Sequence, residues 1–126
     1  RGWELIEGQG SLFHPSYAGV SLGLLHGAQA DALVLCHEPT RRHMRGLPDC
    51  ALPELKRCLE ANLVAARLTN PTVQAVGVAL NTSNLPEAEA TAACRRISDL
   101  LELPCQDPVT MGVEDIVNNL LDRCAN

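Results

Sequence analysis

The feature that most constrains the fold is an alternation of short apolar runs with longer helical patterns. The runs cover residues 3–6, 32–36 and 73–80, and turn-forming residues follow each of them. A short fourth strand is expected near residues 104–106. Strands that alternate with helices form right-handed βαβ units and therefore a parallel sheet. We expect an α/β fold in three layers, a parallel sheet with helices on both faces.

Helical periodicity places the expected helices between these runs. A long helix should begin near Pro53 and end before Pro71, with an apolar stripe at three- to four-residue spacing. A second helix should begin at Pro86, and the last should span about residues 113–121. The apolar stretch 20–25 follows the first run, and a polar loop is expected through Arg42, His43 and Arg45. His26 falls at a helix end, where we interpret it as structural.

Length and composition point to one ordinary domain over residues 1–126. The chain is 46% apolar and 20% charged with a net charge of −5, and only Trp3, Phe13 and Tyr17 are aromatic. This acidity excludes a nucleic-acid surface, which needs a concentrated positive patch. No apolar run reaches the length of a bilayer span, so we expect a soluble, cytoplasmic protein without a membrane partner.

The six cysteines show no metal-binding spacing, and several stand where a small apolar residue belongs. We therefore expect buried free thiols at Cys36, Cys58 and Cys94 and no disulfide framework. The sequence lacks a starting methionine and opens directly on an apolar run. We expect it to be the C-terminal portion of a longer polypeptide or a naturally short form.

Polar residues follow each strand, and the carboxyl ends of parallel strands share one edge, where ligands bind. Glu7 follows the first run, His37 and Glu38 the second, and Asn81 and Thr82 the third. Glu7 could bind Mg²⁺, act as a base, or cap a turn. His37 and Glu38 stand side by side and could serve in catalysis as a base, as ligands or as a hydrogen-bond pair, and a structural role for His37 is the alternative. Asn81 could contact a base or an amide, or form a turn.

Two loops extend this predicted site. Gly8 and Gly10, with Gln9 between them, could present backbone N–H groups to an anion. Ser11, His14 and Ser16 would continue that wall with hydroxyl and imidazole groups. Cationic groups gather in an otherwise acidic chain and suit a phosphate or carboxylate, although a solvated loop is the alternative. They are Arg41, Arg42, His43 and Arg45.

Three stretches of this sequence resemble the C-terminal domain of the D-glutamate N-acetyltransferase family, formerly a domain of unknown function. They are Glu4-Leu5-Ile6-Glu7-Gly8-Gln9-Gly10-Ser11-Leu12-Phe13-His14-Pro15, Ala32-Leu33-Val34-Leu35-Cys36-His37-Glu38-Pro39 and Gly77-Val78-Ala79-Leu80-Asn81-Thr82. A glutamate and two glycines after a strand are also distantly similar to dethiobiotin synthetase and related P-loop enzymes. The resemblance covers nearly the whole chain and implies a P-loop NTPase-like domain that follows a Rossmann-like one.

The resemblance implies acetyl transfer from acetyl-CoA to the amino group of D-glutamate or a similar amino acid. It implies that Glu7 is a catalytic or metal-binding carboxylate and that His14 and residues 8–11 contact substrate. His37, Glu38 and Arg42 would form the other wall. A Mg- and nucleotide-dependent ligase and a non-catalytic assembly module are alternatives from other classes.

One departure from the P-loop pattern is plain. The phosphate-binding motif G-x-x-x-x-G-K-[ST] is absent from this sequence, and in a longer relative it should precede residue 1. Without that segment a sheet edge would be left uncovered, and exposed edges invite pairing. We therefore expect association with the N-terminal part of the polypeptide, or a homo-oligomer, in addition to a small-molecule substrate.

Overall fold

The computed structural model describes residues 2–8 and 11–124. It divides into two compact units, unit 1 (Arg1–Ala30 and His43–Val73) and unit 2 (Asp31–Arg42 and Gln74–Asn126). Because each unit is described by itself, the expectation of one domain stays a prediction. In chain order the elements are α1 (Ala18–Ala28), β1 (Ala32–His37), β2 (His43–Met44), β3 (Leu47–Ala51), α2 (Leu55–Arg67), β4 (Gln74–Leu80), α3 (Glu87–Leu101), β5 (Cys105–Gln106) and α4 (Glu114–Cys124).

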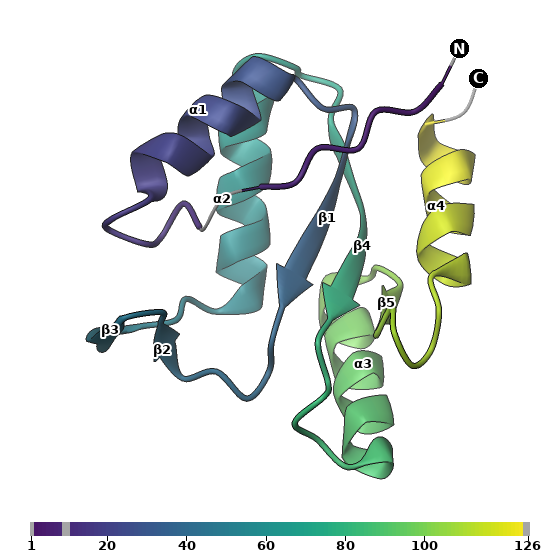
Figure 1. Ribbon diagram of the computed structural model, residues 1–126. Coiled ribbons are helices and arrows are strands. Elements are labelled where there is room, and N and C mark those ends of the chain that lie inside the picture. Colours follow the sequence, from purple (N-terminus) through teal and green to yellow (C-terminus); the bar gives the residue numbers. More distant parts are fainter. Residues whose placement is uncertain (1, 9–10, 125–126) are drawn as a thin grey trace. The chain divides into compact units, whose positions relative to one another are not determined.

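Unit 2 contains the parallel sheet that the alternating pattern predicts. Its strand order is β1-β4-β5, both pairings are parallel, and the arrowheads of β1 and β4 point the same way in Figure 1. Ala32 pairs with Gln74 and His37 with Leu80, with one register shift between Leu33 and Val34. The predicted α/β fold class is confirmed, and the carboxyl ends of β1 and β4 lie at the same edge.

The core of unit 2 is built around β4, which is buried on both faces as expected of a central parallel strand. Val76, Val78 and Leu80 are fully buried on one face. On the other face α4 packs so closely that a Cβ on Gly77 would lie 2.7 Å from Cγ2 of Ile116. A larger side chain at Gly77 would therefore push α4 away from the sheet.

Helix α4 also completes the edge of β4 that the two-residue strand β5 leaves open. The Val78 N–H donates to the carbonyl of Pro104, so this side of β4 faces β5. Further back along the strand, the Asn119 side chain donates to the Val76 carbonyl at 2.8 Å. The Gln106 side chain in turn accepts from the N–H groups of Asp115 and Ile116 in the first turn of α4. These contacts satisfy backbone groups that would otherwise be unpaired.

Helix α3 begins directly after Pro86 as predicted and buries the side of the helix that carries Ala90, Cys94 and Ile97. Burial, together with the neighbouring Cys94 thiol, raises the pKa of Cys105 of β5 to about 12. A thiol with such a pKa is almost entirely protonated at neutral pH, so Cys105 behaves as an apolar core residue.

Unit 1 consists of α1, α2 and a short antiparallel hairpin formed by β2 and β3, and α1 lies beside α2 in Figure 1. In the last turn of α1, Nε2 of His26 donates to the Ala65 carbonyl of α2 at 2.8 Å. This contact bears out the structural interpretation of His26. The hairpin was not predicted, because its strands are short and Pro48 lies within β3, where proline is unusual. Gly46, at φ +77°, lies in its turn.

The predicted first strand is wrong. Residues 2–8 form neither helix nor strand, and Leu5 keeps 92% of its surface exposed. None of the described strands pairs with this segment. An apolar run becomes a strand only when a neighbouring backbone satisfies its N–H and C=O groups, and that partner cannot be identified from the run itself.

None of the six cysteines forms a disulfide, as predicted, but they are not uniformly buried. Cys94 is buried, Cys58 is half-buried and Cys36 is exposed, so the expected burial of Cys36 is wrong. Cys36 lies in β1 on the face of the sheet where α4 contacts β4 and β5 rather than β1. Within residues 2–8 and 11–124, no helix is long and apolar enough to cross a bilayer.

Candidate functional site

The ends of β1 and β4 bring together two of the polar residues that were predicted to follow strands. The N–H of Asn81 donates to the carbonyl of His37 at 2.8 Å, immediately after the two strands end. His37 and Asn81 are thus neighbours at the carboxyl edge of the sheet, the place where parallel α/β sheets bind ligands. We call the segments 37–42 and 81–84 the exit loops.

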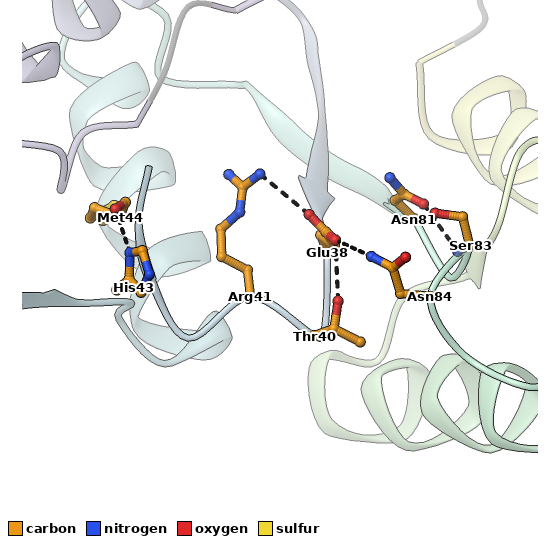
Figure 2. Close-up of polar contacts among 8 residues, drawn as sticks. All are labelled: Glu38, Thr40, Arg41, His43, Met44, Asn81, Ser83 and Asn84. Carbon is orange, nitrogen blue, oxygen red and sulfur yellow. Dashed lines mark hydrogen bonds and ion pairs between the residues drawn. The ribbon is translucent and has the colours of Figure 1, made fainter. Parts of the chain in front are cut away.

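Glu38 holds the two exit loops together (Figure 2). Its Oε1 accepts from the Asn84 side chain at 2.8 Å and from the Thr40 hydroxyl at 3.1 Å. Its Oε2 forms an ion pair with Arg41 at 3.3 Å. Both carboxylate oxygens are therefore occupied by protein donors. In this arrangement Glu38 acts as a clamp between the two exit loops.

His37 is the half-buried titratable group at this edge. Burial and, to a smaller extent, the Arg41 charge lower the pKa of His37, while Glu38 opposes them. Neither ring nitrogen has a hydrogen-bond partner within the described part of the chain. A lowered pKa keeps the imidazole neutral at neutral pH, so one ring nitrogen offers a lone pair to a ligand or proton.

Asn81 forms a turn and also presents a polar group to solvent. Its Oδ1 accepts from the Ser83 N–H at 3.1 Å, which closes an Asx turn after β4 (Figure 2). The side chain is exposed, and its Nδ2 has no protein partner among the residues described. The turn-forming interpretation and the ligand-contact interpretation therefore hold together, since the turn uses the oxygen and leaves the amide N–H groups available.

Asp107, which follows β5, is the buried anchor beneath the second exit loop. It is 3% exposed, and its Oδ2 accepts from both the N–H and the hydroxyl of Thr82. Its Oδ1 accepts from the N–H groups of Val109 and Thr110. The Thr82 hydroxyl, followed by the backbone donors, lowers the pKa of Asp107 to about 2 despite its burial. The hydroxyl of Thr82 is thus committed to Asp107 and is not available to a substrate.

The predicted anion loop is only partly described. Glu7 and Gly8 belong to unit 1 and are exposed, whereas Gln9 and Gly10 lie outside the described residues. Gly8 does not have a positive φ, and a Cβ there would meet nothing within 4 Å. Nothing in the local structure requires glycine at position 8. That Glu7 joins His37 and Asn81 at one rim stays a prediction.

His14 differs most from its predicted role as a substrate contact. The ring is buried, with 5% of the residue exposed, and both nitrogens have protein partners. Nε2 donates to the Arg45 carbonyl at 3.0 Å, and Nδ1 accepts from the Ser16 N–H at 3.1 Å. The Ser11 hydroxyl likewise accepts from the Phe13 N–H. In unit 1 these residues stabilise the turn before α1, with His14 bridging it to the hairpin.

The cationic loop is divided between the two units. Arg41 and Arg42 belong to unit 2, and both are exposed, with Arg41 paired to Glu38. His43 and Arg45 belong to unit 1, where Nδ1 of His43 donates to the Met44 carbonyl at 2.8 Å. Only Arg41 and Arg42 are therefore placed in the same unit as the exit loops.

A metal site is not assembled within the described residues. No three His, Cys, Asp or Glu side chains come together there in a group that could hold a metal ion. Binding of Mg²⁺ by Glu7 stays a prediction, since Mg²⁺ commonly uses only one or two protein carboxylates.

Asn84 and Thr40 were not predicted as part of this region. A carboxylate directly after one strand, and an amide four residues after the next, is the only sequence signal of their contact. That signal becomes informative only once β1 and β4 are known to be adjacent.

A parallel α/β unit whose polar exit loops meet at the carboxyl edge of the sheet has the architecture in which α/β domains bind ligands. The model of the family described as "Domain of unknown function (DUF1611_C) P-loop domain" matches residues 1–117. The chain therefore belongs to the DUF1611 family. A solved DUF1611 family protein from Anabaena variabilis is similar to 92% of this chain, with 33% identity and a TM-score of 0.85, and the match covers 34% of that protein.

Two curated relatives carry a functional name. The D-glutamate N-acetyltransferase of a Pseudoalteromonas species is 52% identical over 118 residues, which is 94% of this chain and 36% of that protein. The D-glutamate N-acetyltransferase of Tritonibacter scottomollicae is 48% identical over 118 residues, 94% of this chain and 35% of that protein. The chain thus spans about a third of the length of these relatives and is related to an acetyltransferase domain.

Proposed function

We propose that this chain forms part of an N-acetyltransferase that moves the acetyl group of acetyl-CoA to the amino group of D-glutamate or a similar amino acid. The names and identities of the two curated relatives support the reaction. The observation that carries the assignment of a site is the clamp at the exit loops, in which protein donors bond both oxygens of Glu38 while His37 and Asn81 stay available. Activity belongs to the complete polypeptide, since this chain spans about a third of its relatives.

His37 is the proposed general base. The amine nitrogen of the acceptor attacks the thioester carbonyl carbon, a C–N bond forms, and the amine proton passes to the neutral imidazole. Collapse of the tetrahedral intermediate breaks the C–S bond, and the CoA thiolate leaves and is protonated to the thiol. A base with a pKa below its ordinary value stays unprotonated at neutral pH, as this step requires.

Asn81 and Arg42 are proposed to position the acceptor. The free Nδ2 of Asn81 can donate to a carboxylate or carbonyl oxygen, and it comes from the strand next to that of His37. The exposed guanidinium of Arg42 can pair with a carboxylate of a dicarboxylic amino acid. Glu38 is a positioning residue in this proposal, because it holds Arg41 and Asn84 and touches the substrate with neither oxygen.

The test compares three variants of the complete polypeptide in a steady-state acetyl-transfer assay with acetyl-CoA and D-glutamate. His37→Gln should lower kcat at least about 100-fold, the usual contribution of a general base. Glu38→Gln should mainly raise the KM for the amino acid, because it loosens the exit loops. His26→Gln is the matched control, since His26 is bonded to Ala65 in unit 1 and should leave the rate constants unchanged.

The pH profile separates a base from a merely structural histidine. The limb of the wild-type kcat/KM profile that is due to protonation of His37 should lie below pH 6.5, because the pKa of His37 is lowered, and His37→Gln should lack this limb. If His37→Gln retains the wild-type kcat and the same profile, the proposed base is wrong.

A nucleotide-dependent ligase is the second candidate, favoured by the P-loop description of the family. Thermal shift decides between the two, because a ligand that prefers the folded state raises Tm. A shift with acetyl-CoA supports the acetyltransferase. A shift with Mg-ATP and none with acetyl-CoA would replace it by the ligase, and no response to either ligand or to D-glutamate would favour an assembly module.

A further inference from the structure

Hydrogen bonds fix the backbone on both sides of Asn81. The N–H of Asn81 donates to the carbonyl of His37 at 2.8 Å. The next residue, Thr82, is bonded to Asp107 through both its N–H and its hydroxyl. Thr82 and Asp107 are 4% and 3% exposed, whereas Asn81 is exposed. The exposed amide of the proposed site is therefore attached directly to a buried anchor.

The Thr82 hydroxyl supplies a side-chain bond to this anchor. The other bonds that fix the loop here come from backbone N–H groups, that of Thr82 to Asp107 at 3.0 Å and that of Leu85 to the Thr82 carbonyl at 2.9 Å. A hydroxyl that donates to an ionised carboxylate forms a charge-assisted bond, which is stronger than a bond between neutral groups. The hydroxyl is thus a strong contact that a single substitution can remove while the backbone stays the same.

The Thr82 side chain points away from the solvent that Asn81 faces. Successive side chains of an extended segment point to opposite sides, and the burial of these two residues alternates in that way. The Thr82 hydroxyl is also occupied by Asp107. An effect of Thr82 on a ligand must therefore pass through Asn81.

The direction of the Asn81 amide depends on the backbone that Thr82 holds. Oδ1 of Asn81 accepts from the Ser83 N–H at 3.1 Å, as Figure 2 shows, so the side chain is tied to the residue after Thr82. Nδ2 shares a carbon atom with Oδ1, and its direction follows. Hydrogen bonds weaken steeply as their angle departs from linear, so a shift of residues 82 and 83 would misalign Nδ2 with a bound carboxylate.

We propose that Thr82 is a positioning residue for the acceptor amino acid, because its bond to Asp107 fixes the backbone from which Asn81 directs its amide at a substrate carboxylate. The inference rests on the proposed function, in which Asn81 contacts the acceptor. It gives Thr82, which was expected to contact the ligand itself, an indirect role in setting the affinity for the amino acid.

The experiment measures acetyl transfer by the complete polypeptide with D-glutamate as the varied substrate. Thr82→Val keeps the shape of the side chain and removes the hydroxyl. It should raise the KM for D-glutamate about 10-fold, the usual loss when a hydrogen bond to a charged group is impaired, and change kcat by less than about twofold. Thr82→Ser keeps the hydroxyl and should stay within about twofold of the wild-type KM.

Two further variants separate positioning from stability. Asn119→Ala is the matched control, because Asn119 stabilises β4 at Val76, outside the exit loops. It should lower Tm and leave the KM for D-glutamate unchanged. The double variant of Asn81→Ala and Thr82→Val should have the same KM as Asn81→Ala alone, because Thr82 acts through Asn81.

Three results would overturn the proposal. One is a Thr82→Val variant that lowers Tm without raising KM, as Asn119→Ala does, and another is an effect of Thr82→Val that persists in full when Asn81 is already alanine. The third uses unsubstituted protein and decides even if a variant fails to fold. The ¹⁵N order parameter of Asn81 Nδ2 should approach the value of about 0.85 found for rigid backbone, and a value below about 0.6 would show an amide that is not positioned.

Failure of the proposed reaction gives a different result. A wild-type polypeptide that binds D-glutamate in calorimetry but transfers no acetyl group would refute the reaction alone. The same variants are then compared by Kd, and Thr82→Val should bind D-glutamate about 10-fold more weakly than wild type and Thr82→Ser. Equal Kd values for the three proteins would overturn the positioning role, and a wild type that does not bind D-glutamate would overturn both proposals.

Discussion

Replacing Asp107 by Asn should strongly destabilise unit 2, because this carboxylate holds two loops from within the core. It accepts from four donors, two on Thr82 and one each on Val109 and Thr110. An amide has only one acceptor oxygen, so its NH₂ group must face N–H or O–H donors on one side and leave them unpaired. Each buried group left unpaired costs about 1–3 kcal/mol.

The magnitude follows independently from the pKa of Asp107. A change of the Asp107 pKa from its ordinary value of 3.8 to about 2 corresponds to about 2 kcal/mol of stabilisation of the charged form. With the unpaired donors included, Asp107→Asn should cost about 2–4 kcal/mol. For a chain of this size that lowers Tm by about 8–15 °C.

The direction of the pKa shift fixes how the stabilisation by Asp107 should change with pH. The folded pKa of Asp107 lies below its unfolded value, so its stabilisation is present above pH 3.8 and is lost as the pH falls through about 2. The difference between wild type and Asp107→Asn should therefore be full at pH 7 and shrink steadily below pH 4.

Urea denaturation of the 126-residue chain at several pH values is the assay, with Asp99→Asn as the control. Asp99 is exposed on α3, and its replacement should change stability by no more than about 0.5 kcal/mol. If Asp107→Asn costs as little as the control, or if its cost is the same at pH 3 as at pH 7, the buried-anchor argument is refuted.

Three further predictions test the packing and the titration of unit 2. Gly77→Ala should cost about 1–3 kcal/mol, because its Cβ would lie 2.7 Å from Ile116. In urea denaturation, the double variant with Ile116→Ala should be less destabilised than the sum of the two single variants, and a simple sum would contradict the clash. Asn119→Ala should cost about 1–2 kcal/mol by leaving the Val76 carbonyl unpaired. The control Asn118→Ala, at an exposed position on the same helix, should be nearly neutral. Equal effects of the two variants in thermal melts would contradict this prediction. The lowered pKa of His37 means that the unfolded chain takes up its proton more readily, so stability should fall as the pH drops below 6.5, and His37→Gln should remove that part of the pH dependence.

The parts of the fold that could be predicted from sequence are those set by local pattern. The apolar run ending at Leu80 and the helix opened by Pro86 are found where the sequence places them, because periodicity and proline act within a few residues. The segment 3–6 has the same apolar character and forms no strand. A strand depends on a partner that is distant in sequence, and no described strand pairs with it.

The same distinction applies to the candidate site. That His37 and Asn81 meet could be predicted, because parallel pairing alone places strand exits at a common edge. What each polar group does there could not, since it depends on partners remote in the chain. Thr82 is taken up by Asp107, His14 by Arg45 and Ser16, and Glu38 by Asn84. Residue type shows that such groups bond, but the fold decides with which partner.

The most direct test of the central proposal is to locate the acceptor on the complete polypeptide by NMR, with ¹⁵N-labelled protein titrated with D-glutamate in the presence of acetyl-CoA. The account predicts that the largest saturable shifts fall on His37, Asn81 and their neighbours in the exit loops. Saturable shifts confined to other surfaces, in a preparation that transfers acetyl groups, would contradict it.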